Sequence, residues 1–246
     1  MRRVFKVFVI GLVVVFFAVM NARAESLVLQ PGAEEGKDAN WYSYPGNSNN
    51  YNFGGLNCFE ITNNRSFQGR GLLRFDLPSE LAGKDIQSAT LSLYAYDTAY
   101  NGDNVIYIDR ATSSWEESPA GTLFTPPSYD TLYQSSSVIS LSSYSWVDFN
   151  ITDMVNFWVS NSDNNYGMVL VTDDTNYNKS VYSYAFSSDY SNPSWRPKLS
   201  IEYSSSVAPE PASFILFGIG AITAIVSKRK KQSKNYRPGI SPGQAM

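Results

Sequence analysis

The sequence predicts an all-β fold, an antiparallel two-sheet β-sandwich with one short helix. Short alternating or apolar runs recur along the chain, turn residues separate them at sandwich-like spacing, and no repeat of fixed period is visible. Two connections rich in Ser, Asn and Tyr, residues 44–55 and 187–195, are expected to form turns that add nothing to the core. The ten candidate strands are SLVLQ, LNCFEIT, GLLRFDL, ATLSLYAY, NVIYIDRA, SVISL, WVDFNI, YGMVLVTD, SVYSYAFS and PKLSIEY.

The clearest strand covers residues 89–96, where small and apolar side chains alternate with polar and tyrosine side chains. One face is therefore predicted to be core and the other a tyrosine-bearing surface. Residues 180–187 also place two tyrosines on one face. A flat ring can stack on the apolar face of a sugar while its polar edge stays in water. The candidate carbohydrate-binding tyrosines are Tyr94, Tyr96, Tyr182 and Tyr184.

Residues 151–160, ITDMVNFWVS, have helical spacing. Met154, Phe157 and Trp158 share one side, and Asp153 falls in the first turn, where a negative charge favours the helix dipole. We expect a short helix across one end of the sandwich. An apolar sequence context favours core packing over sugar contact for three tryptophans, Trp115, Trp146 and Trp158.

Residues 1–24 predict a secretory signal peptide. Arg2, Arg3 and Lys6 precede an apolar run, and Ala22 and Ala24 supply the small residues of a cleavage site. The run is shorter than the ~20 residues that a membrane span needs, and a retained N-terminal anchor is the alternative. We expect an exported chain that begins at residue 25.

The far end of the chain has the composition of a membrane-directed segment. A polar linker, residues 204–211, leads to an apolar and then basic segment, residues 212–231, and the role of residues 232–246 is not assigned. The positive-inside rule keeps the basic cluster cytoplasmic and the apolar run in the bilayer. The segment is either a transient handle for a processing enzyme or a permanent anchor. The candidate sorting residues are Pro209, Glu210, Pro211, Lys228 and Arg229.

The part of the chain between these ends is strongly acidic, because nine Lys and Arg stand against 21 Asp and Glu, a net charge of −12. Such a charge repels phosphate backbones and anionic lipid head groups, so nucleic acid is not an expected partner. Neutral glycans, divalent cations and cationic surfaces remain as possible binding partners. About 180 residues can build one core and are few for two, so residues 25–203 are predicted to form a single domain.

The chain contains no histidine, which removes many catalytic mechanisms. A Ser-His or Cys-His nucleophile system and a His-based zinc or iron site cannot be assembled. Cys58 is the single cysteine, so no intramolecular disulfide forms. We expect a buried apolar thiol there, with a reactive or intermolecular thiol as the alternative.

Carboxylates supply the catalytic chemistry that remains. Glycoside hydrolysis needs two acids that flank the scissile bond. Candidates are the pair Glu116 and Glu117, the pair Asp173 and Asp174, and Asp109. No motif distinguishes any of them from an ordinary solvated carboxylate on the surface, so no catalytic residue is assigned.

Two loops, residues 97–104 and 173–178, place several hard oxygen ligands close together. Calcium prefers roughly six to eight such oxygens, so structural calcium is one expectation for these loops. Ordinary Asx-rich turns are the alternative, and neither loop has EF-hand spacing. The candidate ligands are Asp97, Asp103, Asp173 and Asp174.

The order of several segments resembles that of a known family. Residues 29–55 are followed by RGLLRFDLP, IQSATLSLYAYD, IDRATSSWEES, VDFNITDMVNFWVSNSDNNYGMVLVTDD and YSYAFSSDYSNPSWRPKLSIEY, an order similar to the DNRLRE-domain family, which is related to disaggregatase-associated domains. The resemblance implies a jelly-roll-like β-sandwich of secreted and surface proteins, with carbohydrate binding by some relatives. It implies structural roles for Arg74, Asp76, Trp115, Glu117, Thr152, Arg196 and Pro197. The chain departs from the family pattern where GTLFTPP follows the Trp-Glu motif.

The C-terminal pattern resembles a PEP-CTERM sorting signal. The resemblance implies that an exosortase-type membrane transpeptidase cuts near the Pro-Glu-Pro motif. It also implies a Gram-negative bacterium that makes exopolysaccharide.

These features together predict a non-catalytic protein of the cell surface, exported through the inner membrane, that binds or organises extracellular polysaccharide in a biofilm. The expected partners are that polysaccharide, an exosortase-type enzyme and, transiently, the inner membrane. Arg70 and Arg74 would serve an anionic glycan, although the net charge favours a neutral or calcium-bridged one. The alternatives are an exopolysaccharide hydrolase or lyase with a carboxylate pair, and a structural matrix protein.

Overall fold

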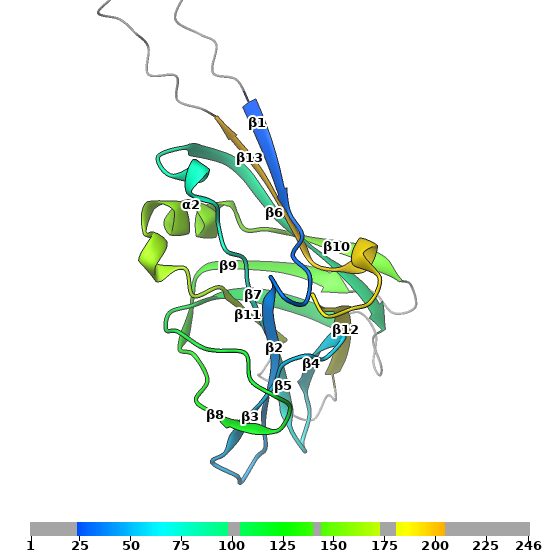
Figure 1. Cartoon of the computed structure of the whole chain (residues 1–246). Helices are drawn as coiled ribbons and strands as arrows, with labels where there is room; N and C mark the ends of the chain where they lie inside the picture. The colour runs from blue at the N-terminus through cyan, green and yellow to red at the C-terminus, as the bar shows by residue number, and fades with distance from the viewer. Residues whose placement is uncertain (1–23, 98–103, 140–143, 173–180, 205–246) are drawn as a thin grey trace, which may run out of the picture. The chain divides into compact units, whose positions relative to one another are not determined.

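The computed structural model describes residues 24–97, 104–139, 144–172 and 181–204 (Figure 1). All of them belong to one of the two compact units of the chain, Arg23–Ser206. This unit contains every residue of the described hydrophobic core, so we expect it to fold by itself.

Antiparallel strands dominate the described residues. One α-helix, α2 (Thr152–Ser160), and three short 3₁₀ helices, η1 (Ser79–Leu81), η2 (Ser162–Asn164) and η3 (Pro193–Trp195), accompany them. The strands are β1 (Ala24–Leu29), β2 (Lys37–Ser43), β3 (Asn50–Phe53), β4 (Cys58–Asn63), β5 (Gln68–Arg74), β6 (Asp85–Asp97), β7 (Asn104–Ala111), β8 (Thr122–Phe124), β9 (Tyr129–Ile139), β10 (Ser145–Asn150), β11 (Met168–Thr172), β12 (Val181–Phe186) and β13 (Lys198–Ser204).

The all-β prediction is confirmed, and the strands form an open, sandwich-like arrangement. Backbone hydrogen bonds join the described strands into one sheet in the order β1-β13-β6-β12-β4-β5-β11-β7-β9, with β10 on β6, and β2, β3 and β8 attached beside β5. The long strand β6 makes this continuity possible. It pairs with β13 along its first part and with β12 near its end, and β10 lies on its other edge.

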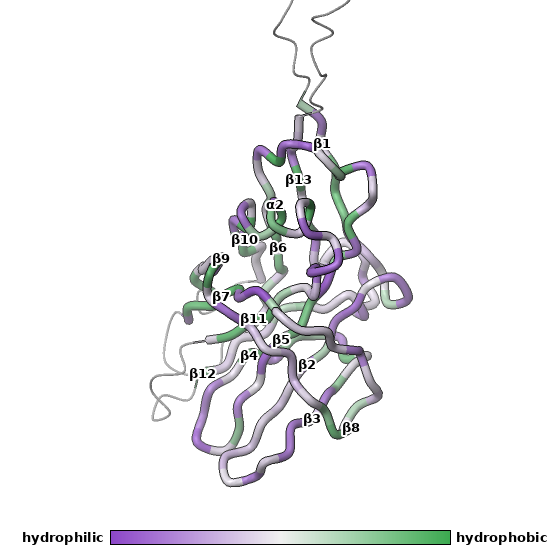
Figure 2. The backbone as a smooth tube through the Cα atoms, turned by 90° about the vertical axis from the view of Figure 1, so that its left-hand side faces the viewer, coloured by the Kyte–Doolittle hydropathy of each residue, from purple (hydrophilic) through white to green (hydrophobic). Residues whose placement is uncertain are grey.

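The core follows the alternation of β6. Ala89, Leu91, Leu93 and Ala95 are at most 1% exposed, as the sequence pattern predicts. The helix α2 packs beside β6, and its buried side chains include Trp158 (Figure 1). Apolar and polar segments alternate along the strands when the backbone is coloured by hydropathy (Figure 2).

Three strands were not predicted, and a fourth, β9, begins at Tyr129, well before the predicted segment 137–141. β2 and β8 were not expected, and β3 lies inside residues 44–55, which were predicted to be a connection. β2 carries polar side chains that look unsuited to a buried strand. Asn40 is only 1% exposed, but its hydrogen-bonding groups are satisfied inside the fold. Its amide nitrogen donates to the carbonyl of Cys58 at 2.7 Å, and its oxygen accepts from the backbone N–H of Glu60 at 2.8 Å.

The first and last strands of the described chain pair with each other. Ala24 lies opposite Ser204 and Leu29 opposite Leu199, so both ends of the described unit meet at one side of the fold (Figure 1). Among the described residues, none of the helices has the length and apolar character needed to cross a membrane.

Candidate functional site

The outward face of strands β10, β6 and β12 carries a concentration of aromatic side chains. The register places Trp146 opposite Tyr94, and Tyr184 opposite Glu60. Ala95 and Ala185 pair with each other and are both buried, so their neighbours along each strand point outward. We call this surface the aromatic face, and its members are Tyr94, Tyr96, Tyr144, Trp146, Tyr184, Phe186, Tyr190 and Trp195.

Two of these rings come from the connection between β12 and β13. Its 3₁₀ helix η3 is held by the Asn192 side chain, which accepts the backbone N–H of Ser194 at 3.1 Å. Arg196 donates from Nε to the carbonyl of Tyr190 at 2.8 Å. This connection was predicted to form turns that add nothing to the core, and neither Tyr190 nor Trp195 belongs to the buried core clusters. The prediction did not include the packing of both rings on the aromatic face.

Most rings of the aromatic face are stacked. The centroids of Tyr94 and Trp195 are 5.1 Å apart with planes 14° from parallel, and those of Tyr96 and Phe186 are 4.5 Å apart at 16°. Tyr190 lies 3.8 Å from Phe186 at 22°. Rings packed in this way restrict one another's rotamers, so the face is rigid before any ligand arrives.

Trp146 and Tyr144 are the exposed rings of the aromatic face. Trp146 is 37% exposed and Tyr144 62% exposed. Trp146 meets the Tyr94 ring edge-on at 70°, and the Lys198 ammonium lies 4.3 Å from its ring centroid. A flat tryptophan fixed from behind and flanked by a cation and tyrosine hydroxyls suits a sugar ring, which has both an apolar face and a polar rim.

The prediction that Trp146 packs in the core is wrong. In β10 the inward positions belong to Val147 and Phe149, which are 7% and 0% exposed, so the alternation forces Trp146 outward. The same prediction is confirmed for Trp115 and Trp158, which are 4% and 1% exposed.

The four predicted tyrosines do not form one group. Tyr94, Tyr96 and Tyr184 belong to the aromatic face, and Tyr184 lies 5.7 Å from Tyr96. Tyr182 packs instead against Phe67, with centroids 6.3 Å apart. Its hydroxyl accepts a hydrogen bond from the Asn64 amide at 2.9 Å.

Glu60 links this face to β2. The Tyr42 hydroxyl donates to Glu60 at 2.8 Å, and the Tyr184 hydroxyl lies 3.4 Å from its other oxygen. Burial first, and then the Glu60 carboxylate, raises the pKa of Tyr42 well above its ordinary value, so Tyr42 remains a donor at neutral pH. Glu60 is therefore oriented by two tyrosines.

Cys58 lies on β4 opposite Phe186, at the border of the aromatic face. Its thiol is half-buried, which corrects the expected apolar core position. Burial raises the pKa of Cys58, and a hydrogen bond with Tyr96 opposes that shift. A thiol with a raised pKa is a poor nucleophile, which argues against a reactive role.

The two predicted arginines lie apart from the aromatic face. Arg70, 7% exposed, sits on β5 with its guanidinium 4.8 Å from the Trp41 ring centroid. Arg74 forms an ion pair with Asp76 at 3.1 Å and lines a pocket elsewhere. The predicted grouping of arginines with tyrosines is therefore not seen.

The candidate carboxylates are engaged in the fold. Glu116 pairs with Lys37 at 2.6 Å, a contact that lowers the pKa of Glu116. Glu117 accepts the backbone N–H groups of Asp38 at 3.3 Å and Gly55 at 3.2 Å. Asp109 is buried and accepts from the Gln134 amide at 2.7 Å. These contacts match the structural role that the sequence resemblance implied for Glu117.

Several predicted positions lie outside the described residues. They include the predicted metal ligands and acids Asp103, Asp173 and Asp174 and the sorting residues Pro209, Glu210, Pro211, Lys228 and Arg229; Asp97 ends β6, but its side chain is not described. Within the described ranges, no cluster of three or more Asp, Glu, Cys or His side chains has the arrangement of a metal site. Calcium stays a prediction.

An antiparallel β-sandwich-like domain with exposed, pre-ordered aromatic rings on a sheet face has the features of a sugar-binding module. The comparison with family models agrees. Carbohydrate-binding module family 96 matches residues 35–203, and the chain belongs to this family. A PEP-CTERM protein-sorting motif matches residues 207–230. A search of curated proteins found no match.

These matches refine the sequence predictions. The PEP-CTERM resemblance is confirmed, whereas the matching family is carbohydrate-binding module family 96 and the DNRLRE name is not confirmed. The chain is an exported carbohydrate-binding protein with a membrane-sorting signal.

Proposed function

We propose that this protein holds extracellular polysaccharide at the surface of a Gram-negative cell without cleaving it, and that the aromatic face is the binding surface. The carrying observation is the pair of exposed rings, Trp146 and Tyr144, fixed by the stacked rings beside them. Preformed aromatic surfaces lose little conformational entropy on binding. The face also offers Lys198 and tyrosine hydroxyls to the sugar rim.

A non-catalytic role is supported by the state of the candidate acids. Glu116 is neutralised by Lys37, and Glu117 is occupied by backbone N–H groups. Glycoside hydrolysis requires two acids that flank the scissile bond, and a carboxylate already occupied by a cation or by backbone donors is less available for that role.

We expect the Arg23–Ser206 unit to be retarded in affinity gels that contain neutral polysaccharide, with no release of reducing or unsaturated ends. The same gels without polysaccharide, and gels with a strongly anionic polysaccharide, are the controls. The net charge of −12 between the chain ends predicts weaker retardation by the anionic polymer. Release of sugar ends would favour the hydrolase or lyase, and no retardation by any glycan would favour a structural matrix protein.

We further propose that an exosortase-type enzyme removes the C-terminal segment after the apolar run enters the inner membrane. The matched sorting motif supports this, as does the basic cluster that fixes its orientation. Mass spectrometry of protein from the native host is expected to show a C-terminus near Pro209, Glu210 or Pro211. Glu210→Ala should leave the segment attached, while Ser206→Ala should be processed normally. A native protein that still ends at Met246 would contradict the processing step.

A further inference from the structure

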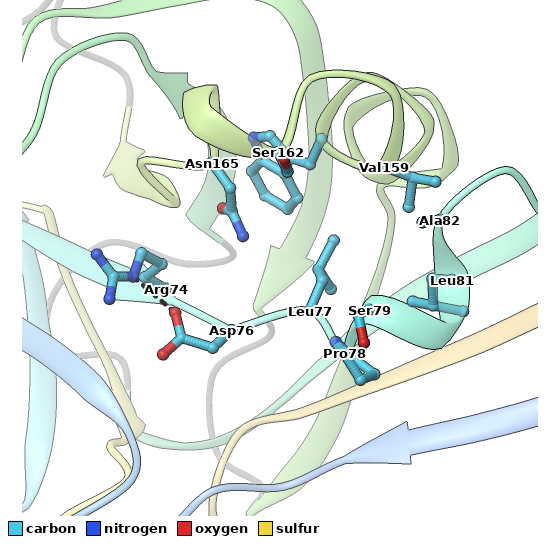
Figure 3. A pocket seen from close by; sticks show the side chains of 11 residues that line it. Arg74, Asp76, Leu77, Pro78, Ser79, Leu81, Ala82, Val159, Ser162 and Asn165 are labelled. Atoms are coloured by element: carbon cyan, nitrogen blue, oxygen red, sulfur yellow. Dashed lines mark ion pairs between the residues drawn. The ribbon is translucent and has the colours of Figure 1, made fainter.

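A second site lies away from the aromatic face, between η1 and the C-terminal end of α2. It is a pocket of about 310 Å³ (Figure 3). Arg74 and Asp76 lie on one side of it, and Leu81, Ala82 and Val159 on the other. Of its lining residues, the sequence analysis named Arg74 as a candidate for binding an anionic glycan and assigned structural roles to Arg74 and Asp76.

The pocket has the size and lining of a small-ligand site. Ligand pockets span about 300 to 1,000 Å³, so this one is large enough for a single ring and small for an oligosaccharide. Its apolar side chains come from η1, from α2 and from the loop before η1, and the hydroxyl groups of Ser79 and Ser162 supply polar contacts. The Asn165 amide also lines the pocket, but it already donates to the carbonyl of Phe75 at 2.9 Å and accepts from the backbone N–H of Gly167 at 3.2 Å. Such a mixed lining suits a ring with apolar faces and a hydroxylated edge.

The charges in the pocket favour a neutral ligand. Nε of Arg74 lies 3.1 Å from Oδ1 of Asp76, so the two groups neutralise each other. That N–H is not aligned for a hydrogen bond with the carboxylate and has no other partner among the described residues. The Nε–H itself is buried, but the Arg74 side chain is 27% exposed and the Asp76 side chain 78% exposed, so the guanidinium can offer its other N–H donors, and the carboxylate its acceptors, to vicinal hydroxyls.

Trp158 adds an unsatisfied polar group to the same lining. It is 1% exposed, and within the described structure its indole N–H lacks a hydrogen-bond partner. An unpaired buried donor costs about 1–3 kcal/mol. That nitrogen has almost no accessible surface, so a ligand would contact the Trp158 ring, and the indole N–H signal would report on binding beside it.

We propose that this pocket binds one neutral sugar ring, at the end of a glycan chain, independently of the aromatic face. A protein with two such sites can contact two glycan chains, or two parts of one chain, and so organise a matrix as well as adhere to it. This goes beyond the proposed function, because the pocket could bind sugar even where the aromatic face does not.

The test uses nuclear magnetic resonance of the Arg23–Ser206 unit with D-glucose, D-galactose, D-mannose and L-rhamnose, each at millimolar concentration. The five tryptophans give few indole N–H signals, which makes assignment direct. At least one sugar should shift the Trp158 signal and leave those of Trp146 and Trp195 in place. If none of the four shifts Trp158, or if only the aromatic-face signals move, the pocket proposal is wrong.

Variants test the same pocket from its rim. Ala82→Phe should reduce monosaccharide affinity at least about tenfold by filling the pocket from an exposed position. Asp76→Ala should weaken binding similarly by removing the acceptor. Ala33→Phe, an exposed position outside the pocket, is the matched control and should change nothing. Equal affinity in Ala82→Phe and Ala33→Phe, or full affinity in Asp76→Ala, would overturn the assignment.

Discussion

Trp146→Ala is expected to weaken polysaccharide binding at least about tenfold while leaving the fold intact. Trp146 is 37% exposed and contributes no inward side chain to β10, so its removal opens no cavity in the core. It presents a large rigid ring, and truncation of such an anchor in an interface commonly has the greatest effect on affinity. Retardation in affinity gels and the melting temperature measure the two effects separately.

Tyr44→Ala is the matched control for this substitution. Tyr44 is 39% exposed and also contacts aromatic neighbours, but it lies next to β2, outside the aromatic face. It should leave retardation unchanged. Equal losses in both variants, or full binding by Trp146→Ala, would rule out the aromatic face as the binding surface. Monosaccharide binding in the Arg74–Asp76 pocket should persist in Trp146→Ala, which separates the two sites.

The stability of the domain is expected to fall as pH rises through the range from about 4 to about 7. Asp38 is 1% exposed, and burial raises its pKa from 3.8 to about 7, although hydrogen bonds from Ser188 partly oppose the shift. Between these two values the folded state keeps a proton that the unfolded state has released. The free energy of unfolding should therefore be highest at acid pH and lower by up to roughly 4 kcal/mol above pH 7.

Neighbouring acids reinforce this direction. Burial raises the pKa values of Glu117 and Asp189, and the charges of both acids raise that of Asp38. Lys37 lowers the pKa of Glu117 only as a minor contribution. Arg196 lowers the pKa of Asp189, an effect second only to burial. Ionisation of the group nevertheless places several negative charges together, because burial is the largest cause of the shift for each of the three acids.

Asp38→Asn should largely remove this pH dependence. The amide oxygen can still accept the Ser188 backbone N–H, and the side chain stays neutral at every pH. Urea unfolding at about pH 5 and about pH 8 should give similar stabilities for the variant and different ones for the natural protein. Asp163→Asn, at an exposed position in η2, is the control and should keep the natural slope. An unchanged slope in Asp38→Asn would contradict the role of Asp38.

The helix prediction shows how far local pattern reaches. α2 begins one residue after the predicted segment and ends with it at Ser160. Its spacing places Met154 and Trp158 inward, as observed. Local periodicity was sufficient to predict this helix, because its apolar residues lie on one face and that face packs against the core.

The site was less predictable for two reasons. Trp146 was assigned to the core from its apolar neighbours, although the alternation with Val147 and Phe149 carried the correct signal. Tyr190 and Trp195 gave no periodic signal at all, because they belong to a connection that folds back over the sheet. Arg70 was separated from the tyrosines by the order of the strands, which no local pattern encodes.

The sequence by itself determined the all-β class, the inward face of β6, the helix α2 and the C-terminal sorting motif. These depend on local periodicity, composition and short motifs. The tertiary structure alone decided that β12 would lie beside β6, that the connection before β13 would stack its rings on both, and that Arg74 and Asp76 would meet α2 around a pocket. Strand pairing between residues far apart in the chain is set by the global packing of the core, so the surfaces it assembles appear only in the folded molecule.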